Sequence, residues 1–419
     1  MVVAVSDVER KLMLIDVLSE EADLNLEPPA EAAKEWSEAQ IRAWFAKQAG
    51  GEGGGGVEGE HGSDGALEDD AGAGGTGPED VVKRWFPSWK GPQVACRLPR
   101  ARVLCFPCAG SGEDMYSKSG KSTYNGLVSM CTRNRVEMLA VQPPGRGARG
   151  REAFLPSAQA IAEEAAAAFA AHVEREGRGD AGRTVPWFLV GHSVGTWVAY
   201  ETARRLTSDH GFPPPLRFFL SSFPAPDIDP SVRPWRYAAS ADPDDVAFKK
   251  DAATWGTDPM VFSAAMWGTQ GFGALLRADF SLFDTYALDP ERPSPTVTPT
   301  DDSESPPLAP PPPPHLTGVA ATLFSAQRDA VVTRDHVQDW LRFLGAPAET
   351  SRLESIDGTH LFPVLHQDAA ARAKWLDHVC IDILADLKRE QVRVHSTATT
   401  TESGGSTMSL PKAVLLSPP

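Results

Sequence analysis

Ser193 lies between two glycines in GHSVG (residues 191–195), a spacing that favours a nucleophilic serine. Such a serine sits on a sharp, strained strand-to-helix turn, and small residues two places before and after it avoid a clash. The apolar run FLV precedes the pentapeptide and the helical pattern TWVAYETARRL follows it. A plain glycine turn is the alternative interpretation, but the strand and helix on either side favour the nucleophile.

A serine hydroxyl is a weak nucleophile, so it needs a basic side chain to take its proton. His360, in the loop sequence DGTHLF, is the candidate base. His366 and His378 fall in a predicted final helix, where a surface role is expected. His192 neighbours the serine but points elsewhere on a tight turn, so we expect packing or a polar contact from it.

The base must in turn be oriented by an acid, which lies between serine and histidine in the chain order of such folds. Asp329 follows the apolar run AATLFSA, at the carboxyl end of a predicted strand where sites on open α/β sheets lie. Asp227 and Asp229 follow the preceding strand and are rival acids.

Acyl chemistry also needs backbone N–H groups that stabilise a developing oxyanion. We expect one from Val194, directly after the serine, and a second from the loop in RVLCFPCAGSGEDMY, at Ala109 or Cys108. Cys105 and Cys108 form a C-x-x-C, which raises a redox or zinc alternative. Proline and glycines follow this pair where a redox helix would begin, and no second ligand pair stands elsewhere, so we expect no metal and no cofactor.

The elements that must position these residues alternate between short apolar runs and amphipathic stretches. ARVLCF, VEMLAVQ, PWFLVG, LRFFLSS and AATLFSA predict buried strands, and AIAEEAAAAFAAHV and GTWVAYETARRL predict helices. This alternation predicts an α/β fold, with a mostly parallel sheet and helices on both faces.

Composition divides the chain into several predicted segments. Ser37 and Gln40 fit a capping box in the first of them. The segments are a helical N-terminal extension (1–48), a flexible Gly-rich acidic linker (49–80), the main domain (81–390), a disordered proline-rich insertion within it (291–314) and a disordered tail (391–419).

Charge and cysteine content narrow the class of protein. The formal net charge is −16, but residues 1–80 hold nineteen acidic and five basic residues, which leaves −2 for the rest. A nearly neutral main domain gives no indication of nucleic-acid binding. Five cysteines are few for this length, and neither a signal peptide nor a membrane-spanning run is evident, so we expect a cytoplasmic protein without a membrane partner.

Several motifs occur in a fixed order: FPCAGSGEDMY, VQPPGRGARGRE, GHSVG, LLRADFSLFDTY, SAQRDAVV and DGTHLF. Together they resemble the type II thioesterases of polyketide and nonribosomal peptide synthesis, which have the α/β-hydrolase fold. The resemblance covers about residues 85–388. It implies Ser193, Asp329 and His360 as nucleophile, acid and base, and Ala109 as the second oxyanion amide.

This resemblance implies hydrolysis of small acyl thioesters, or of acyl groups on the phosphopantetheine arm of an acyl carrier protein, for editing or release in polyketide, nonribosomal peptide or fatty acid synthesis. A helical lid is expected at about residues 235–286. Its apolar side chains are candidates for contacting the substrate, and the alternative is that they simply pack in the hydrophobic core. They include Trp255, Met260, Phe262, Met266, Trp267 and Phe272.

Other functions remain as alternatives at this stage. The same three catalytic residues would serve a carboxylesterase or lipase acting on free esters. A non-catalytic binding protein on a hydrolase fold is a third interpretation. Residues 1–48 are a candidate docking module for a protein partner, and a helical pair packed on its own domain is the simpler interpretation of them.

Overall fold

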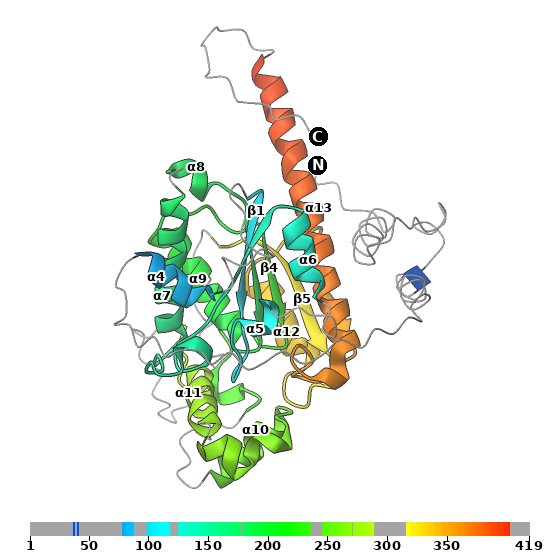
Figure 1. Cartoon of the computed structure of the whole chain (residues 1–419). Coiled ribbons are helices and arrows are strands. Elements are labelled where there is room, and N and C mark those ends of the chain that lie inside the picture. The colour runs from blue at the N-terminus through cyan, green and yellow to red at the C-terminus, as the bar shows by residue number, and fades with distance from the viewer. Residues whose placement is uncertain are drawn as a thin grey trace, which may run out of the picture.

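A parallel sheet of six strands organises the described part of the chain, in the order β2–β1–β3–β4–β5–β6 (Figure 1). The computed structural model describes residues 37, 40–41, 78–87, 99–117, 125–176, 179–235, 245–269, 271–288 and 316–402. The strands are β1 (Ala101–Phe106), β2 (Val136–Ala140), β3 (Trp187–His192), β4 (Arg217–Ser221), β5 (Ala320–Ala326) and β6 (Arg352–Ile356). All five neighbouring pairs are parallel, as predicted.

The strands have apolar side chains on both faces, so each face requires a covering layer. In β1, Leu104 and Phe106 pack into one hydrophobic core, whereas Val103 and Cys105 pack into the other. Successive side chains of a strand point to opposite faces, and a run that is apolar throughout is therefore buried on both.

Helices cover both faces of the sheet, which confirms the predicted α/β-hydrolase architecture (Figure 1). One face carries α4 (Pro78–Trp85), α7 (Ala158–Arg175), α9 (Gly195–Ser208) and α12 (Arg334–Phe343). The other carries α5 (Asp114–Ser117), α6 (Gly126–Arg133) and α13 (Ala369–Glu402). The short helices are η2 (Gly147–Arg149), α8 (Asp180–Arg183), η3 (Pro230–Val232) and η7 (His366–Asp368). Among the described helices, none combines the length and the apolar character needed to cross a bilayer.

The chain between β4 and β5 forms the α10–α11 segment, which lies beyond one end of the sheet (Figure 1). It contains α10 (Val246–Thr254), η5 (Pro259–Phe262), the π-helical turn η6 (Ala265–Thr269) and α11 (Phe272–Asp284). The Trp255 ring, directly after α10, contacts the ring of His360, which follows β6. The segment therefore covers the carboxyl end of the sheet, and it falls within the range predicted for a lid.

Two helices cross the predicted limits of the main domain. Helix α4 begins at Pro78, ahead of residue 81, and its side of the domain buries Val82 and Phe86 completely. Helix α13 continues to Glu402, past residue 391 where the sequence predicts a low-complexity tail.

The predicted segments 1–48, 49–80 and 291–314 lie outside the described residues, except for residues 37, 40–41 and 78–80. Within the first of these, the predicted capping box is confirmed. The Ser37 N–H donates to Gln40 Oε1 at 2.8 Å, and the Gln40 N–H donates to Ser37 Oγ at 3.4 Å.

Candidate active site

Ser193 occupies the turn between β3 and α9 with a φ of +54°, in the left-handed region that a non-glycine residue rarely adopts. The two flanking glycines are required by close contacts. A Cβ on Gly195 would lie 2.4 Å from the carbonyl oxygen of Phe106, and one on Gly191 would lie 2.8 Å from the carbonyl oxygen of Gly195. The strained serine and the crowded glycines are the features of a nucleophile elbow.

The structure brings Ser193, His360 and Asp329 into one hydrogen-bonded line. Ser193 Oγ lies 2.9 Å from His360 Nε2, and His360 Nδ1 lies 2.7 Å from Asp329 Oδ2. The three residues follow the carboxyl ends of β3, β6 and β5, which meet at one edge of a parallel sheet. All three side chains are nearly inaccessible to solvent.

Asp329 is held by polar partners at both of its carboxylate oxygens. Oδ1 accepts hydrogen bonds from the N–H groups of Val331 and Val332, each at 2.9 Å, and Oδ2 faces His360. Burial alone would raise the pKa of this carboxyl. The nearby His360 and the hydrogen bonds outweigh burial, so the pKa of Asp329 is lowered from its usual 3.8. A carboxylate therefore faces Nδ1, which leaves Nε2 free to accept the serine proton.

The rival acids are engaged elsewhere. Asp227 Oδ2 accepts a hydrogen bond from Arg342 Nη2 at 2.8 Å. Asp229 caps the short helix η3, where its Oδ1 accepts from the Ser231 N–H at 2.7 Å. Neither aspartate takes the place of Asp329 beside the imidazole of His360.

His192 is fully buried and supports the loop that carries His360. Its Nε2 lies 2.8 Å from the His360 carbonyl oxygen, which only accepts, so Nε2 carries the proton. Its Nδ1 then accepts from the Ser221 hydroxyl at 2.7 Å. Burial lowers the pKa of His192 well below its usual 6.5, and the adjacent His360 lowers it further. The polar contact expected of His192 is thus present, and its partner, the backbone carbonyl of His360, could not be identified from the sequence.

The other two late histidines lie apart from this line. His366 is exposed at the start of η7, as expected. The prediction of a surface role was wrong for His378, which is 3% exposed in α13. That helix packs one face against the sheet, and His378 lies on the packed face beside Phe324.

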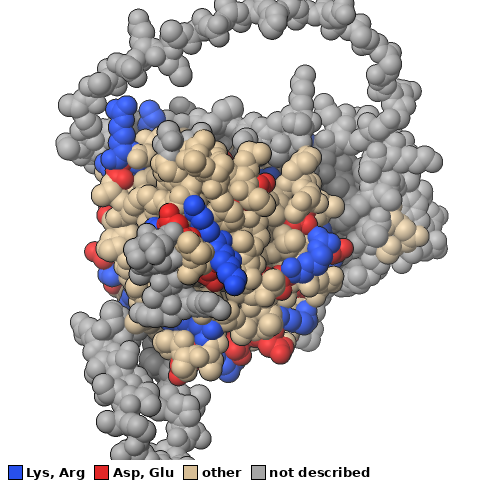
Figure 2. Space-filling view, turned by 90° about the horizontal axis from the view of Figure 1, so that it is seen from below, with Lys and Arg blue, Asp and Glu red and all other residues tan. Residues whose placement is uncertain are grey.

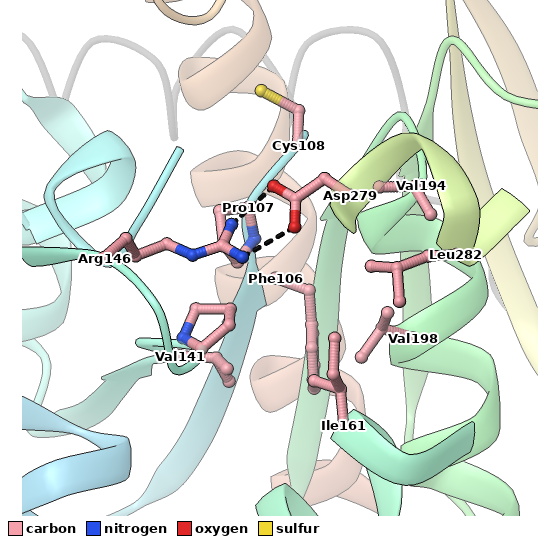
Figure 3. Close-up of a pocket in the computed structure, with 11 residues that line it drawn as sticks. Phe106, Pro107, Cys108, Val141, Arg146, Ile161, Val194, Val198, Asp279 and Leu282 are labelled. Atoms are coloured by element: carbon pink, nitrogen blue, oxygen red, sulfur yellow. Dashed lines mark hydrogen bonds and ion pairs between the residues drawn. The ribbon is translucent and has the colours of Figure 1, made fainter. Parts of the chain in front are cut away.

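Two backbone N–H groups remain open near the serine. Neither the Val194 nor the Ala109 N–H has an acceptor among the described residues. Gly195 brings α9 against the β1–α5 loop (residues 107–113), because the Gly195 Cβ position lies 2.5 Å from the Pro107 carbonyl oxygen. Val194 and Cys108 also line a common cavity of ≈ 20 Å³ (Figure 3). The two segments expected to supply oxyanion donors are therefore in contact.

The thiols of the C-x-x-C pair are enclosed in the hydrophobic core. Burial raises the pKa of Cys105 well above its usual 9.0, and burial raises that of Cys108 to about 11. Burial therefore favours the neutral thiol over the thiolate, the form that acts as a nucleophile. Cys108 Sγ instead lies 3.3 Å from Ser111 Oγ.

One group of potential metal ligands exists among the described residues, away from Ser193. It comprises Glu137, His172 and Glu176. Glu137 Oε2 is already bonded to the buried guanidinium of Arg102 at 3.0 Å, and Arg102 also pairs with Glu176. A cation enclosed among carboxylates makes this cluster a buried ion-pair network.

The predicted lid side chains have different positions. Trp255 is 4% exposed, and its ring centroid lies 4.7 Å from that of His360 in an edge-to-face contact. Trp267 is buried against Phe248. Met260 is 70% exposed and does not reach the site, Phe262 and Met266 are partly buried, and Phe272 lines a groove of ≈ 750 Å³. Trp255 is thus the lid residue in direct contact with the proposed base.

The face of the molecule at this end of the sheet carries charges of both signs. In Figure 2, Lys and Arg side chains stand singly beside Asp and Glu side chains across a surface that is otherwise uncharged. The described surface of this face therefore carries no large patch of a single charge sign.

Comparison with known proteins supplies independent information. A family profile described as thioesterase domain matches residues 101–373. Thioesterase PikA5 of Streptomyces venezuelae is 33% identical over 36% of this chain and 43% of its own length. The Gramicidin S biosynthesis protein GrsT of Aneurinibacillus migulanus is 24% identical over 51% of this chain and 72% of its own. The aligned region thus spans less than half of PikA5.

Solved structures with a similar fold include RedJ, a thioesterase from the prodiginine biosynthetic pathway of Streptomyces coelicolor. It superposes with a TM-score of 0.48 at 23% identity, over 68% of this chain and 86% of RedJ. The type II thioesterase BorB from the borrelidin biosynthetic cluster has a TM-score of 0.46 at 22% identity, over 67% of this chain and 96% of BorB.

Proposed function

Because the chain belongs to the thioesterase family, we propose that it is a serine hydrolase of acyl thioesters carried on the phosphopantetheine arm of a carrier protein. The observation that carries this proposal is the unbroken line from Ser193 through His360 to Asp329 at 2.9 and 2.7 Å. The names of two relatives, a thioesterase and a Gramicidin S biosynthesis protein, support thioester hydrolysis in a biosynthetic pathway.

In the first half of the reaction, Ser193 Oγ attacks the thioester carbonyl carbon while His360 Nε2 takes the hydroxyl proton. Asp329 holds the Nδ1–H tautomer and stabilises the imidazolium that forms. The N–H groups of Val194 and Ala109 stabilise the negative oxygen of the tetrahedral intermediate. The carbon–sulfur bond then breaks, and the thiol leaves with the proton from His360.

In the second half, water attacks the acyl-serine ester while His360 Nε2 accepts one of its protons. The second tetrahedral intermediate collapses, and the proton passes to Ser193 Oγ. The products are a carboxylic acid and free enzyme, and the steps add up to hydrolysis of one thioester by one water.

The burial of the reacting groups supports a substrate on a slender arm. Ser193 and His360 are 4% and 3% exposed, so a folded carrier protein cannot bring its own surface to the serine. The groove of ≈ 750 Å³ runs beside Gly110 and Gly112 of the β1–α5 loop and Pro363 of the loop after His360. Glycines line much of this groove, and their lack of side chains leaves room for an extended chain.

Thiol release from an acyl-pantetheine thioester tests this function, with the matching oxygen ester as the comparison. We expect Ser193→Ala to abolish turnover while the protein stays folded, and a fluorophosphonate to label Ser193. A wild-type rate in Ser193→Ala, or labelling of another residue, would contradict the mechanism. Preference for the oxygen ester would instead indicate a carboxylesterase.

A further inference from the structure

Two motifs that take no part in the Ser193–His360–Asp329 line meet in the structure. Arg146 comes from PPGRG in the loop after β2, and Asp279 comes from LRADF in helix α11. Arg146 Nη1 lies 2.6 Å from Asp279 Oδ2, and Nη2 lies 2.6 Å from Oδ1. The guanidinium and carboxylate face each other across the cavity edge, joined by two parallel bonds (Figure 3).

This pair also holds the β1–α5 loop. The Gly110 N–H donates to Asp279 Oδ2 at 2.7 Å, and Arg146 Nη1 donates to the Ser111 carbonyl oxygen at 3.0 Å. Gly110 has a φ of +76°, and a Cβ there would lie 2.9 Å from a methyl carbon of Leu276 in α11. The loop and the helix are therefore in direct contact around these bonds.

The bond to Gly110 constrains the neighbouring residue. Because a peptide unit is planar, fixing the Gly110 N–H also fixes the carbonyl side of Ala109. Only the two backbone dihedrals of Ala109 then separate this anchored plane from the Ala109 N–H, the proposed oxyanion donor. A displacement of the Asp279 carboxylate would therefore also displace the Ala109 N–H, which is only one residue away from the bonded Gly110 N–H.

We propose that Arg146 and Asp279 are positioning residues that lock helix α11 to the β1–α5 loop and so aim the Ala109 N–H at the reacting oxygen. The proposal rests on the function proposed above. Both side chains are largely withdrawn from solvent, with 8% of Arg146 and 3% of Asp279 exposed. Two-pronged, charge-assisted bonds of this kind fix geometry as well as energy, and neither lysine nor asparagine reproduces them.

The test compares Asp279→Asn and Arg146→Lys, the two clamp variants, with a matched buried pair at the opposite end of the sheet. In that control pair, Arg217 Nε lies 2.8 Å from Asp386 Oδ2, and Arg217 begins β4. Asp386→Asn therefore removes a similar charge without touching the β1–α5 loop. Active-site titration with a fluorophosphonate gives the folded, reactive fraction, so kcat is expressed per competent molecule.

We expect each clamp variant to lower kcat about tenfold to a hundredfold with KM changed less than about threefold, since an ångström-scale misplacement costs about that much. The affinity for octylboronic acid, which forms a tetrahedral adduct on Ser193, should fall by the same factor. Asp386→Asn should lower Tm and leave kcat and boronate affinity within about twofold.

Folded clamp variants with wild-type kcat would overturn the proposal, as would a raised KM with kcat unchanged. A fall in kcat of the same size in Asp386→Asn would overturn it as well. Should Asp279→Asn not fold, Arg146→Lys, which keeps the positive charge, decides the matter alone. Ser193→Ala is assayed in parallel. If Ser193→Ala retains turnover, the proposed function has failed. If Ser193→Ala loses turnover while both clamp variants keep the wild-type kcat, only the positioning role of Arg146 and Asp279 is refuted.

Discussion

Asp329→Asn is the substitution whose effect the structure defines most closely. Oδ1 of Asp329 accepts from the N–H groups of Val331 and Val332, so in the variant the amide oxygen must stay at that position. A flipped amide would direct its NH₂ at two donors. The NH₂ is therefore forced to face His360 Nδ1, which lies 2.7 Å from Oδ2 in the wild type.

An NH₂ in that place donates, so His360 Nδ1 has to accept and the ring proton moves to Nε2. Nε2 then donates towards Ser193 Oγ and cannot take its proton. In a serine protease, the corresponding change costs about 10⁴-fold in kcat. We expect a loss of that order here, which is about 5.5 kcal/mol of transition-state stabilisation at about 1.4 kcal/mol per tenfold.

Thiol release from an acyl-pantetheine thioester measures this loss, and Asp227→Asn is the matched control. The Asp227 carboxylate, 7% exposed, pairs with Arg342 and does not contact His360, so we expect its variant to lose some stability but to stay within about threefold of the wild-type kcat. The reasoning fails if Asp329→Asn keeps more than about a tenth of wild-type kcat, or if Asp227→Asn is the more severe variant.

Further expectations concern stability, packing and the N-terminal extension. The pKa of Asp329 is lowered in the folded state, so its contribution to the free energy of unfolding is complete above about pH 4 and disappears as pH falls through that lowered pKa. Denaturant unfolding of wild type and Asp329→Asn at a series of acidic pH values should show the difference between their free energies of unfolding narrowing as pH falls. Gly195→Ala places a Cβ 2.4 Å from a carbonyl oxygen, so we expect a destabilisation of about 1–3 kcal/mol in denaturant and a large fall in kcat. Cys108→Ala should keep kcat within about tenfold and show no dependence on reductant, because the expected donor is backbone. Deletion of residues 1–77, which carry a net charge of −12, should preserve folding and raise the on-rate for an acidic carrier at low salt. Deletion through residue 87 should instead unfold the protein, because it removes buried Val82, Trp85 and Phe86. Slower turnover of the carrier-bound substrate after the shorter deletion would indicate docking on residues 1–48.

Five of the six strands and the three residues of the proposed triad were accessible from sequence. Strands buried on both faces are mostly apolar, as in ARVLCF, where Arg102 is the one charged residue, and they end where the pattern changes. The strained turn at Ser193 requires glycines at fixed offsets, and that requirement is visible in GHSVG. Asp329 follows a predicted strand, so its place at the carboxyl edge of the sheet could be expected. The strand before His360, β6, is RLESI, and its three polar residues hid it from the apolar pattern; His360 was assigned from its motif and the chain order instead.

Other parts of the site depend on contacts across long stretches of chain, which no local pattern encodes. The pairing of Arg146 with Asp279 joins residues from two motifs whose spacing gives no sign that they meet. The edge-to-face contact of Trp255 with His360 and the burial of His378 follow from how α10 and α13 dock. The linker boundary predicted at residue 80 falls inside helix α4, because only the buried face of this helix, not its composition, ties it to the core.

Asp279 lies in helix α11 between residues that line the groove and residues buried in the core. Before it, Phe272 and Leu275 line the ≈ 750 Å³ groove, and after it Leu282 and Phe283 are buried in the core. Under the proposed function, changes at Phe272 and Leu275 alter the lining of the groove without removing the bond from the Gly110 N–H to Asp279. A library intended to change how the arm of the carrier is accommodated should therefore randomise Phe272 and Leu275 and keep Asp279.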